Sequence, residues 1–285
     1  MNIYLEKGYE RSFGTFPLKG KQLNTALSTA IDVGYRSIDT AQMYGNEKDI
    51  GECLSTAAID RNDLFITTKV HPDHFTDKLF IPSVEKSLRD LRIDQVNVLL
   101  LHWPPIDGQI LNSLQLLEQA YNQKLALHIG VSNYTSTMMR SAASSINAPL
   151  IINQVEFHPL LNQDALLVAS NETNIPLSSY CSVARGQISQ YPIFDEIGKN
   201  YGKSSSQVAL RWILQKGVSI NSMSTKRKNI ENNLTEYEGK FEVIKVPNIT
   251  NICYGRGVGY KIEKISLSKE IEGISATEIR KKMKI

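Results

Sequence analysis

LFITTKVHPDHFTDKLFIPSVEKSLRDLRIDQVNVLLLH, residues 64–102, contains two short apolar runs separated by a stretch of mixed polarity. The runs LFITTK (64–69) and VNVLLLH (96–102) have the length and composition of buried strands. Between them, IPSVEKSLRDLR (81–92) places apolar residues three or four positions apart, which is typical of an amphipathic helix. A helix between two almost wholly apolar strands indicates a parallel strand–helix–strand unit, because such a helix covers the sheet.

The same alternation of strand and helix recurs along most of the chain. Further helices are expected over 21–34, 110–123 and 204–217. The strands are expected at 12–16, 35–39, 64–69, 96–102, 125–131, 150–156, 175–181 and 218–221. Eight such units close most naturally into a (β/α)₈ TIM barrel of the α/β class. An open doubly wound sheet is the alternative fold, although no GxGxxG motif follows the first strand.

The strand–helix rhythm stops near residue 235. The sequence that follows predicts one strand, a Gly-rich polar loop, a second strand and a short basic helix. We therefore expect two parts: a barrel over residues 1–235, and a short non-barrel α+β extension over residues 236–285.

The composition is that of a globular protein, with 41% hydrophobic residues, 21% charged residues and a formal net charge of +3. This balance favours neither disorder nor a nucleic-acid partner. The cysteines Cys53, Cys181 and Cys253 lack the spacing of a disulfide framework or a zinc site. There is no long apolar run, and the opening MNIYLEKGYERS carries charges where a signal peptide needs its apolar core. We expect a cytoplasmic protein without a membrane partner, with a monomer favoured and its oligomeric state left open.

Polar residues accumulate at the C-terminal ends of the expected strands, where a barrel of this kind carries its chemistry. Asp39, Lys69 and His102 end the second, third and fourth strands, and Tyr44 follows Asp39 in the next loop. Each residue alone has a structural explanation, as a helix cap, a solvated strand end or a loop aromatic. The four together indicate a site for carbonyl reduction.

The chemistry of these four side chains supports that interpretation. A free tyrosine has a pKa of about 10, and a nearby ammonium lowers that value by favouring the phenolate. We expect Lys69 to act in this way on Tyr44, with Asp39 holding the lysine protonated and oriented. His102 is expected to donate a hydrogen bond to the substrate carbonyl oxygen, where negative charge develops.

Three further residues follow the same strand ends. Trp103 is expected to form either an apolar wall of the substrate pocket or packing at the barrel rim. His71 and His74 in VHPDHF suggest a metal site, but two histidines without a third ligand make a poor one. We expect these histidines to shape substrate access, and we expect no metal.

Longer motifs, taken in order, resemble the signature segments of the aldo-keto reductases. The resemblance covers about residues 10–235 and is strongest to the bacterial 2,5-diketo-D-gluconate reductase B type. It implies a barrel that binds a nicotinamide cofactor without a dinucleotide-binding glycine motif. The motifs are GYRSIDTAQMYGNE (34–47), ITTK (66–69), LLLHWP (99–104), GVSNY (130–134), NQVEFHP (153–159), SSYCSVARG (178–186) and STKRKNIENNL (224–234).

The resemblance also implies roles for individual residues. The catalytic tetrad of the family falls on Asp39, Tyr44, Lys69 and His102, and the substrate would contact Tyr44, His102 and Trp103. An aromatic face suits the flat nicotinamide ring, which would stack on Tyr180. The other implied cofactor contacts come from Gly14, Thr15, Asp39, Ser132, Asn133 and Gln154.

The expected site for the cofactor phosphate departs from the family pattern. Members of the family usually have Lys-Ser followed by an Arg that binds the 2′-phosphate of NADPH. The corresponding residues of this chain are Met223, Ser224 and Asn229. A basic cluster nearby could restore the positive charge, or could simply be a solvated helix start. NADPH is therefore favoured, and NADH is less expected. The candidate residues are Ser224, Lys226, Arg227, Lys228, Asn229 and Asn233.

The end of the chain carries a second, shorter resemblance. GISATEIRKKM (273–283) is similar to the ISSTxIR segment of cytidylyltransferase-like nucleotidyltransferases, with Ser275, Thr277 and Arg280 at the phosphate-holding positions. The HxGH motif of that superfamily is absent from this chain.

Taken together, the motifs make reduction of an aldehyde, an α-dicarbonyl or a keto-sugar acid the leading function. The alternatives are a binding role on a catalytically impaired scaffold and nucleotide binding by the tail.

Overall fold

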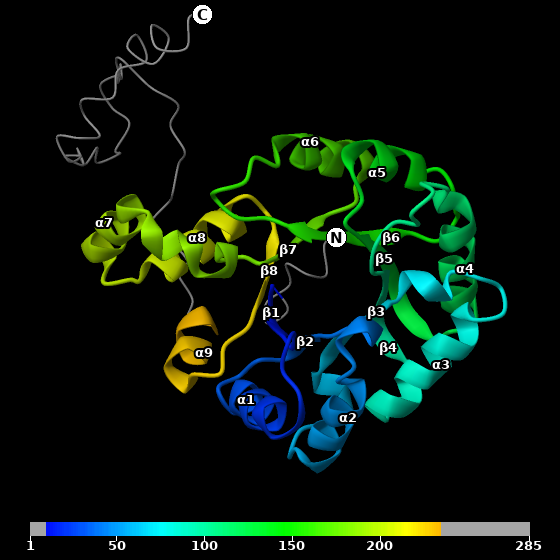
Figure 1. The fold of residues 1–285 in the computed structure, drawn as a ribbon, viewed down its shortest axis with the longest axis horizontal. Helices are drawn as coiled ribbons and strands as arrows, with labels where there is room; N and C mark the ends of the chain where they lie inside the picture. The colour runs from blue at the N-terminus through cyan, green and yellow to red at the C-terminus, as the bar shows by residue number, and fades with distance from the viewer. Residues whose placement is uncertain (1–9, 235–285) are drawn as a thin grey trace, which may run out of the picture. The chain divides into compact units, whose positions relative to one another are not determined.

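The computed structural model describes residues 10–234, in which eight parallel strands close into a barrel. Each strand pairs with its neighbours in chain order, and β1 pairs with β8 to complete the ring. Figure 1 looks into this ring, with the helices around its outside. The expected (β/α)₈ barrel is confirmed. The open doubly wound sheet is excluded, because an open sheet has no pairing between its first and last strands.

Every expected strand is found close to its expected bounds. The four helices expected from periodicity appear as α1, α3, α4 and α8. The strands are β1 (Arg11–Gly14), β2 (Ser37–Asp39), β3 (Phe65–Val70), β4 (Val96–Leu101), β5 (Ala126–Ser132), β6 (Leu150–Glu156), β7 (Leu177–Tyr180) and β8 (Ser219–Ser222). The helices are α1 (Gly20–Asp32), α2 (Glu47–Thr56), α3 (Phe80–Leu91), α4 (Ile110–Asn122), α5 (Ser136–Ala142), α6 (Asp164–Thr173), α7 (Pro192–Tyr201), α8 (Ser205–Gln215) and α9 (Arg227–Leu234).

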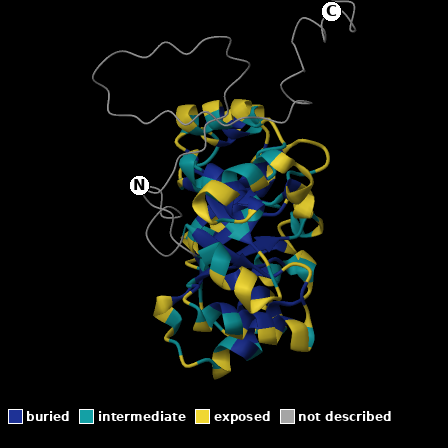
Figure 2. Cartoon of the chain, turned by 90° about the vertical axis from the view of Figure 1, so that its left-hand side faces the viewer, coloured by how far each residue is buried: buried dark blue, intermediate teal, exposed yellow. Residues whose placement is uncertain are grey.

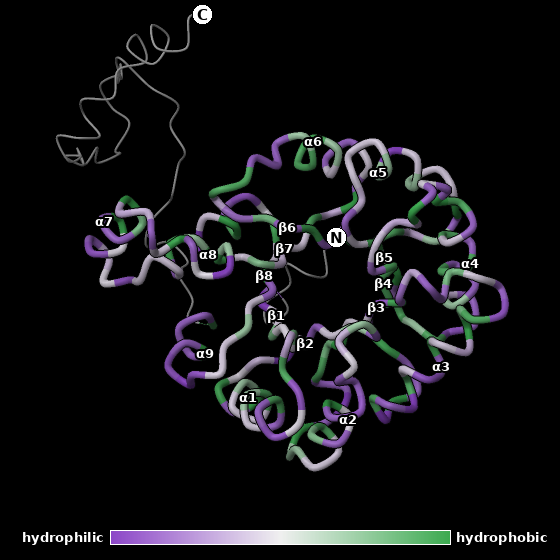
Figure 3. Tube along the Cα trace, viewed as in Figure 1, coloured by the Kyte–Doolittle hydropathy of each residue, from purple (hydrophilic) through white to green (hydrophobic). Residues whose placement is uncertain are grey.

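Alternate residues of each strand face opposite sides of the barrel wall, as the pleat of a strand requires. On β3, Ile66 and Val70 belong to the apolar layer that the helices cover, whereas Thr67 and Lys69 alternate with them and face the other side. A small apolar cluster of Phe65, Val98, Leu100 and Ile152 is separate from that layer. In Figure 2 the strands are mostly buried, and the exposed residues lie on the outer faces of the helices and in the loops. Figure 3 shows the matching alternation of hydrophilic and hydrophobic segments along the helices.

The predictions for the C-terminal extension concern residues outside the described part of the chain. These are the boundary near residue 236, Cys253, and the phosphate-holding Ser275, Thr277 and Arg280; all stay predictions from the sequence. Within residues 10–234, no helix has both the length and the apolar character needed to cross a membrane.

Helix α2, which follows the expected proton donor, packs on α3 through a glycine. A Cβ added at Gly51 would lie 2.1 Å from the carbonyl oxygen of Asp90 and 2.9 Å from the Cα of Leu91. These are backbone atoms at the end of α3, so they cannot move aside as a side chain can. The close approach of the two helices therefore requires glycine at this position.

We predict that Gly51→Ala lowers the free energy of unfolding by about 1–3 kcal/mol, the usual cost of overpacking. Lys48→Ala is the matched control, because Lys48 is exposed on the same helix and alanine is a strong helix former. Urea unfolding monitored by circular dichroism measures both variants. Equal stability of Gly51→Ala and Lys48→Ala would show that α2 and α3 can separate at no cost.

Candidate active site

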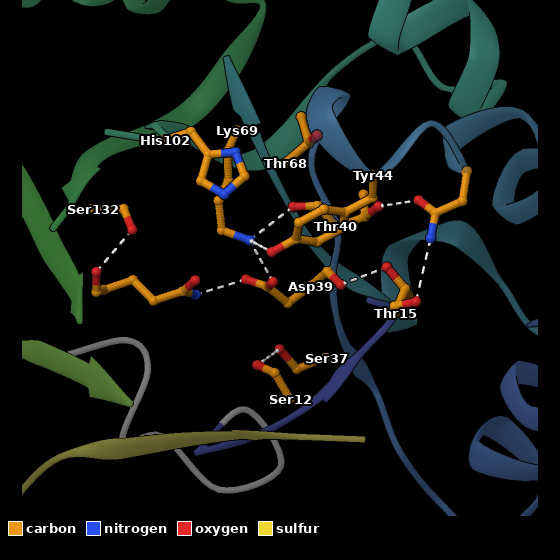
Figure 4. Close-up of polar contacts among 12 residues, drawn as sticks. Ser12, Thr15, Ser37, Asp39, Thr40, Tyr44, Thr68, Lys69, His102 and Ser132 are labelled. Carbon is orange, nitrogen blue, oxygen red and sulfur yellow. Dashed lines mark hydrogen bonds and ion pairs between the residues drawn. The ribbon is translucent and has the colours of Figure 1, made fainter. Parts of the chain in front are cut away.

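The C-terminal ends of β2, β3 and β4 bring together the four residues that the sequence singles out. Asp39 ends β2, Lys69 lies near the end of β3, and His102 directly follows β4. Tyr44 closes the short 3₁₀ turn η2 (Gln42–Tyr44), which leads from β2 into α2. Figure 4 shows the side chains of Asp39, Tyr44 and Lys69 converging, with the ring of His102 beside them.

Lys69 is the centre of this arrangement. Its side chain is fully buried, and its Nζ donates to Oδ1 of Asp39 at 2.5 Å, to the carbonyl oxygen of Thr40 at 2.9 Å and to Oη of Tyr44 at 3.3 Å. Burial by itself lowers the pKa of the Lys69 ammonium, but the charge of Asp39 and the contact with Tyr44 raise it above its usual value. Lys69 is therefore a cation at neutral pH, as expected.

The pKa of Tyr44 differs from the expectation. Burial raises the pKa of the phenol, and the neighbouring Lys69 lowers it only in part, while the charge of Asp39 raises it again. The net direction is upward, so the expectation that Lys69 leaves this pKa below 10 is wrong for the structure. The physical reason is burial, which disfavours the charged phenolate, together with the charge of Asp39, which partly offsets that of Lys69. Tyr44 consequently holds its proton at neutral pH and is able to donate it.

His102 completes the group as a neutral imidazole. Its ring meets the edge of the Tyr44 ring at a centroid distance of 5.5 Å. Burial, followed by the charge of Lys69, lowers the pKa of His102 to about 3. Its Nδ1 is buried without a hydrogen-bond partner among residues 10–234. A buried N–H without a partner is costly, so the tautomer with the proton on Nε2 is favoured.

Amide and hydroxyl groups from the next strands lie beside Asp39. Gln154 donates from Nε2 to Oδ2 of Asp39 at 2.7 Å, and Ser132 donates to the carbonyl oxygen of Gln154. Tyr180 donates its hydroxyl proton to Oδ1 of Asn133 at 2.7 Å, which holds the aromatic ring in one orientation. These groups fit a flat ring with a carboxamide, because an oriented aromatic ring and several amide and hydroxyl groups come from consecutive strand ends.

Gly14 and Thr15 lie at the end of β1, and the structure gives them different surroundings. A Cβ at Gly14 would lie 2.6 Å from Oδ1 of Asn221, an oxygen that is buried and without a partner among the described residues. Thr15 is fully buried, and its hydroxyl donates to the carbonyl oxygen of Asp39.

Asn46, which the sequence did not single out, donates to the carbonyl oxygens of Thr15 and Leu18. Only tertiary contacts reveal this residue, because asparagine in a loop is ordinary.

The expected phosphate-binding residues follow β8, so they leave the barrel at the same end as the tetrad. Ser224 accepts a hydrogen bond from the backbone N–H of Lys226 just before α9. Arg227 pairs with Glu231 on the same helix, with 2.9 Å between Nε and Oε1. Lys226 and Lys228 are exposed. A helix N-terminus with exposed cations is suited to an anion. Asn229 is exposed and Asn233 is partly buried.

The remaining predicted residues surround the tetrad. Trp103 stacks on the His102 ring at a centroid distance of 6.4 Å and is 44% exposed, so it offers an aromatic surface at the mouth. His71 lies just before the 3₁₀ turn η4 (Pro72–His74), and His74 is the last residue of that turn. Both histidines interact with Gln42.

Comparisons with known proteins agree with this geometry. The sequence model described as "Aldo/keto reductase family" matches residues 12–252. Methylglyoxal reductase DkgB of Escherichia coli is 34% identical over 224 residues, which is 78% of this chain and 84% of the relative. An aldo-keto reductase of Mycobacterium marinum is 37% identical over 228 residues, which is 79% of this chain and 80% of the relative. A crystal structure described as a 2,5-diketo-D-gluconic acid reductase B has a TM-score of 0.76 at 38% identity, covering 80% of this chain and 83% of the other.

The depressed pKa of His102 predicts an acid-sensitive stability. The folded protein keeps His102 neutral down to about pH 3, whereas the unfolded chain protonates it near pH 6.5. Its contribution is thus fully present above pH 6.5 and is lost as the pH falls toward 3. Between pH 7 and pH 4.5, we predict that His102→Gln loses about 2 kcal/mol less stability than the wild type. Urea unfolding at both pH values measures this difference, and equal losses in both proteins would contradict it.

Proposed function

This chain belongs to the aldo/keto reductase family and is an oxidoreductase acting on carbonyl groups, and we propose that it reduces an aldehyde or ketone to the alcohol with NADPH. The observation that carries this proposal is the position of Lys69, whose Nζ lies between Asp39 and the hydroxyl of Tyr44. That contact chain places a protonated phenol against a buried cation at the mouth of the barrel.

The side chains divide the chemistry between them. Asp39 keeps Lys69 charged and oriented, and Tyr44 donates the proton from Oη to the substrate oxygen as its own O–H bond breaks. The phenolate that remains is stabilised by Lys69 and regains its proton from water. His102 donates from Nε2 to the same substrate oxygen, and so stabilises the negative charge that develops there.

The nicotinamide cofactor supplies the hydride when it is bound. We place its ring against Tyr180, with its carboxamide near Ser132, Asn133 and Gln154. The basic start of α9 is the proposed contact for the 2′-phosphate of NADPH. Support for this assignment is the exposure of Lys226 and Lys228 where the chain leaves β8.

We propose an α-dicarbonyl or a keto-sugar acid as the substrate class, with simple aldehydes included. Support comes from the names of two relatives, methylglyoxal reductase and 2,5-diketo-D-gluconic acid reductase B. Methylglyoxal is an α-dicarbonyl, and 2,5-diketo-D-gluconic acid is a keto-sugar acid. A cytoplasmic location and a monomeric state stay predictions. A panel of carbonyl substrates, each assayed with NADPH and with NADH, tests substrate and cofactor together.

We predict that Tyr44→Phe lowers carbonyl turnover by about 10²–10⁴-fold, the usual contribution of a general acid. NADPH binding should be nearly unchanged, because the phenolic proton is used in the chemical step and does not hold the cofactor. Steady-state kinetics and fluorescence titration with NADPH measure the two effects. Turnover above half of the wild-type value would remove Tyr44 from the mechanism.

Neutralising Lys226, Arg227 and Lys228 together should weaken NADPH binding by about 1.5–3 kcal/mol, the value of one charge-assisted hydrogen bond. NADH binding should change less, because NADH has no 2′-phosphate. Isothermal titration with each cofactor measures the difference. Equal losses for the two cofactors would show that the basic cluster does not contact the phosphate.

A further inference from the structure

Gln42, which opens the turn that carries Tyr44, makes hydrogen bonds with both ends of its side-chain amide. Its Nε2 donates to Oγ of Ser83 at 3.2 Å, to the carbonyl oxygen of Ser83 at 3.1 Å and to Oγ of Ser87 at 3.1 Å. Its Oε1 accepts from the backbone N–H of His71 at 2.9 Å and from Nδ1 of His74 at 2.8 Å. One side chain thus links the η2 turn to helix α3 and to the η4 turn.

The orientation of this amide is determined by its partners. The backbone N–H of His71 is always a donor, so the amide atom that faces it must be the oxygen. That oxygen carries no proton, and His74 therefore donates from Nδ1. Burial lowers the pKa of His74, so the ring is neutral at pH 7 and this tautomer is retained. A flipped amide would place its NH₂ group against the N–H of His71 and its oxygen against the carbonyl oxygen of Ser83.

The contacts continue from Gln42 toward the buried lysine. Ser87 donates to Oε2 of Glu47 at 3.0 Å, and Thr68 donates to Oε1 of the same carboxylate at 2.6 Å. Thr68 is the neighbour of Lys69 on β3. Gln42 therefore connects the turn bearing the phenol to the strand bearing the ammonium, along a path separate from the direct contact between Lys69 and Tyr44.

The turn itself offers few other restraints. Met43 is 45% exposed, and Tyr44 reaches Lys69 at 3.3 Å, which is long for a hydrogen bond. The backbone N–H of Tyr44 donates to the carbonyl oxygen of Ala41, a contact within the turn that does not attach it to the barrel. The ring of Tyr44 packs against Phe16 and His102, and its hydroxyl makes the one long contact with Lys69. The side chain of Gln42 supplies the other hydrogen bonds that anchor η2 to α3 and to the His71–His74 segment.

We propose that Gln42 is a positioning residue that holds the hydroxyl of Tyr44 at its place beside Lys69. This inference rests on the proposed function, in which Tyr44 donates the proton. A displacement of about 1 Å in a reacting group costs up to about 100-fold in rate. Loss of the Gln42 amide should therefore slow the chemical step while substrate binding changes little.

Gln42→Leu is the test, and Gln119→Leu is the matched control, because Gln119 is exposed on α4. We expect kcat to fall about 10- to 100-fold in Gln42→Leu, with KM within about 3-fold of the wild type and kcat of Gln119→Leu unchanged. Gln42→Glu keeps the acceptors for His71 and His74 but loses the donor to the Ser83 carbonyl, so its kcat should lie between the two. It also serves if the leucine variant does not fold.

A double-mutant cycle separates positioning from a general loss of structure. In a Tyr44→Phe background there is no proton donor to position, so Gln42→Leu should cause no further loss of the residual turnover. The same fold loss in both backgrounds would overturn the proposal. A kcat of Gln42→Leu or Gln42→Glu equal to that of Gln119→Leu would also overturn it.

A measurement without substrate tests the inference independently of activity. The ionisation of Tyr44 is read from ultraviolet difference spectra against Tyr44→Phe in each background. In Gln42→Leu the phenol should be more exposed, and its raised pKa should fall toward 10. An unchanged pKa would overturn the positioning role. A wild-type protein that reduces no carbonyl compound would instead contradict the proposed function, and this titration would still decide the role of Gln42.

Discussion

The ammonium of Lys69, buried inside a barrel of apolar strands, is the constraint on which the site depends. A charge without solvent is tolerated only when it is paired and its hydrogen-bonding capacity is used. Asp39, the Thr40 carbonyl and the Tyr44 hydroxyl meet that requirement. The second carboxylate oxygen of Asp39 is satisfied in turn by Gln154 on β6, across the barrel. The need to pair one buried cation thus accounts for the positions of polar groups on several strands.

This constraint also explains the opposite pKa shifts within one small volume. Asp39, Lys69 and His102 are buried, so the pKa of each ionisable group depends strongly on burial and on the charges nearest to it. Lys69 has a carboxylate partner, which raises its pKa and keeps it charged, whereas His102 has none, so its pKa is lowered and the ring stays neutral. Tyr44 has both the cation and the anion near it, and burial then prevails. The result is a cation, a neutral imidazole and a protonated phenol at the same pH, which are the protonation states that carbonyl reduction needs.

The barrel positions these groups by its wall geometry. Side chains alternate along each strand between the helix layer and the barrel interior. Asp39 and Lys69 both face the interior, and they meet because β2 and β3 are adjacent. Loops then add what strands cannot supply: Tyr44 from a short turn, held through Gln42, and Thr15 and Asn46 from neighbouring segments. Rigid strands with a few anchored turns are a general solution for holding reacting groups to within a fraction of an ångström.

The local sequence predicted most of the elements and singled out the four candidate catalytic residues. Apolar runs and helical periodicity predict the eight strands and four of the helices, α1, α3, α4 and α8, because these patterns reflect short-range geometry. Asp39, Lys69 and His102 are recognisable since they interrupt or end apolar strands where polar residues are costly. Only the tertiary structure determined the direction of the Tyr44 pKa, the anchoring by Gln42 and Asn46, and the closeness of Gln154 to Asp39. Each of these depends on burial or on contacts between residues 28 to 115 positions apart, and neither quantity is encoded in the spacing of neighbouring residues.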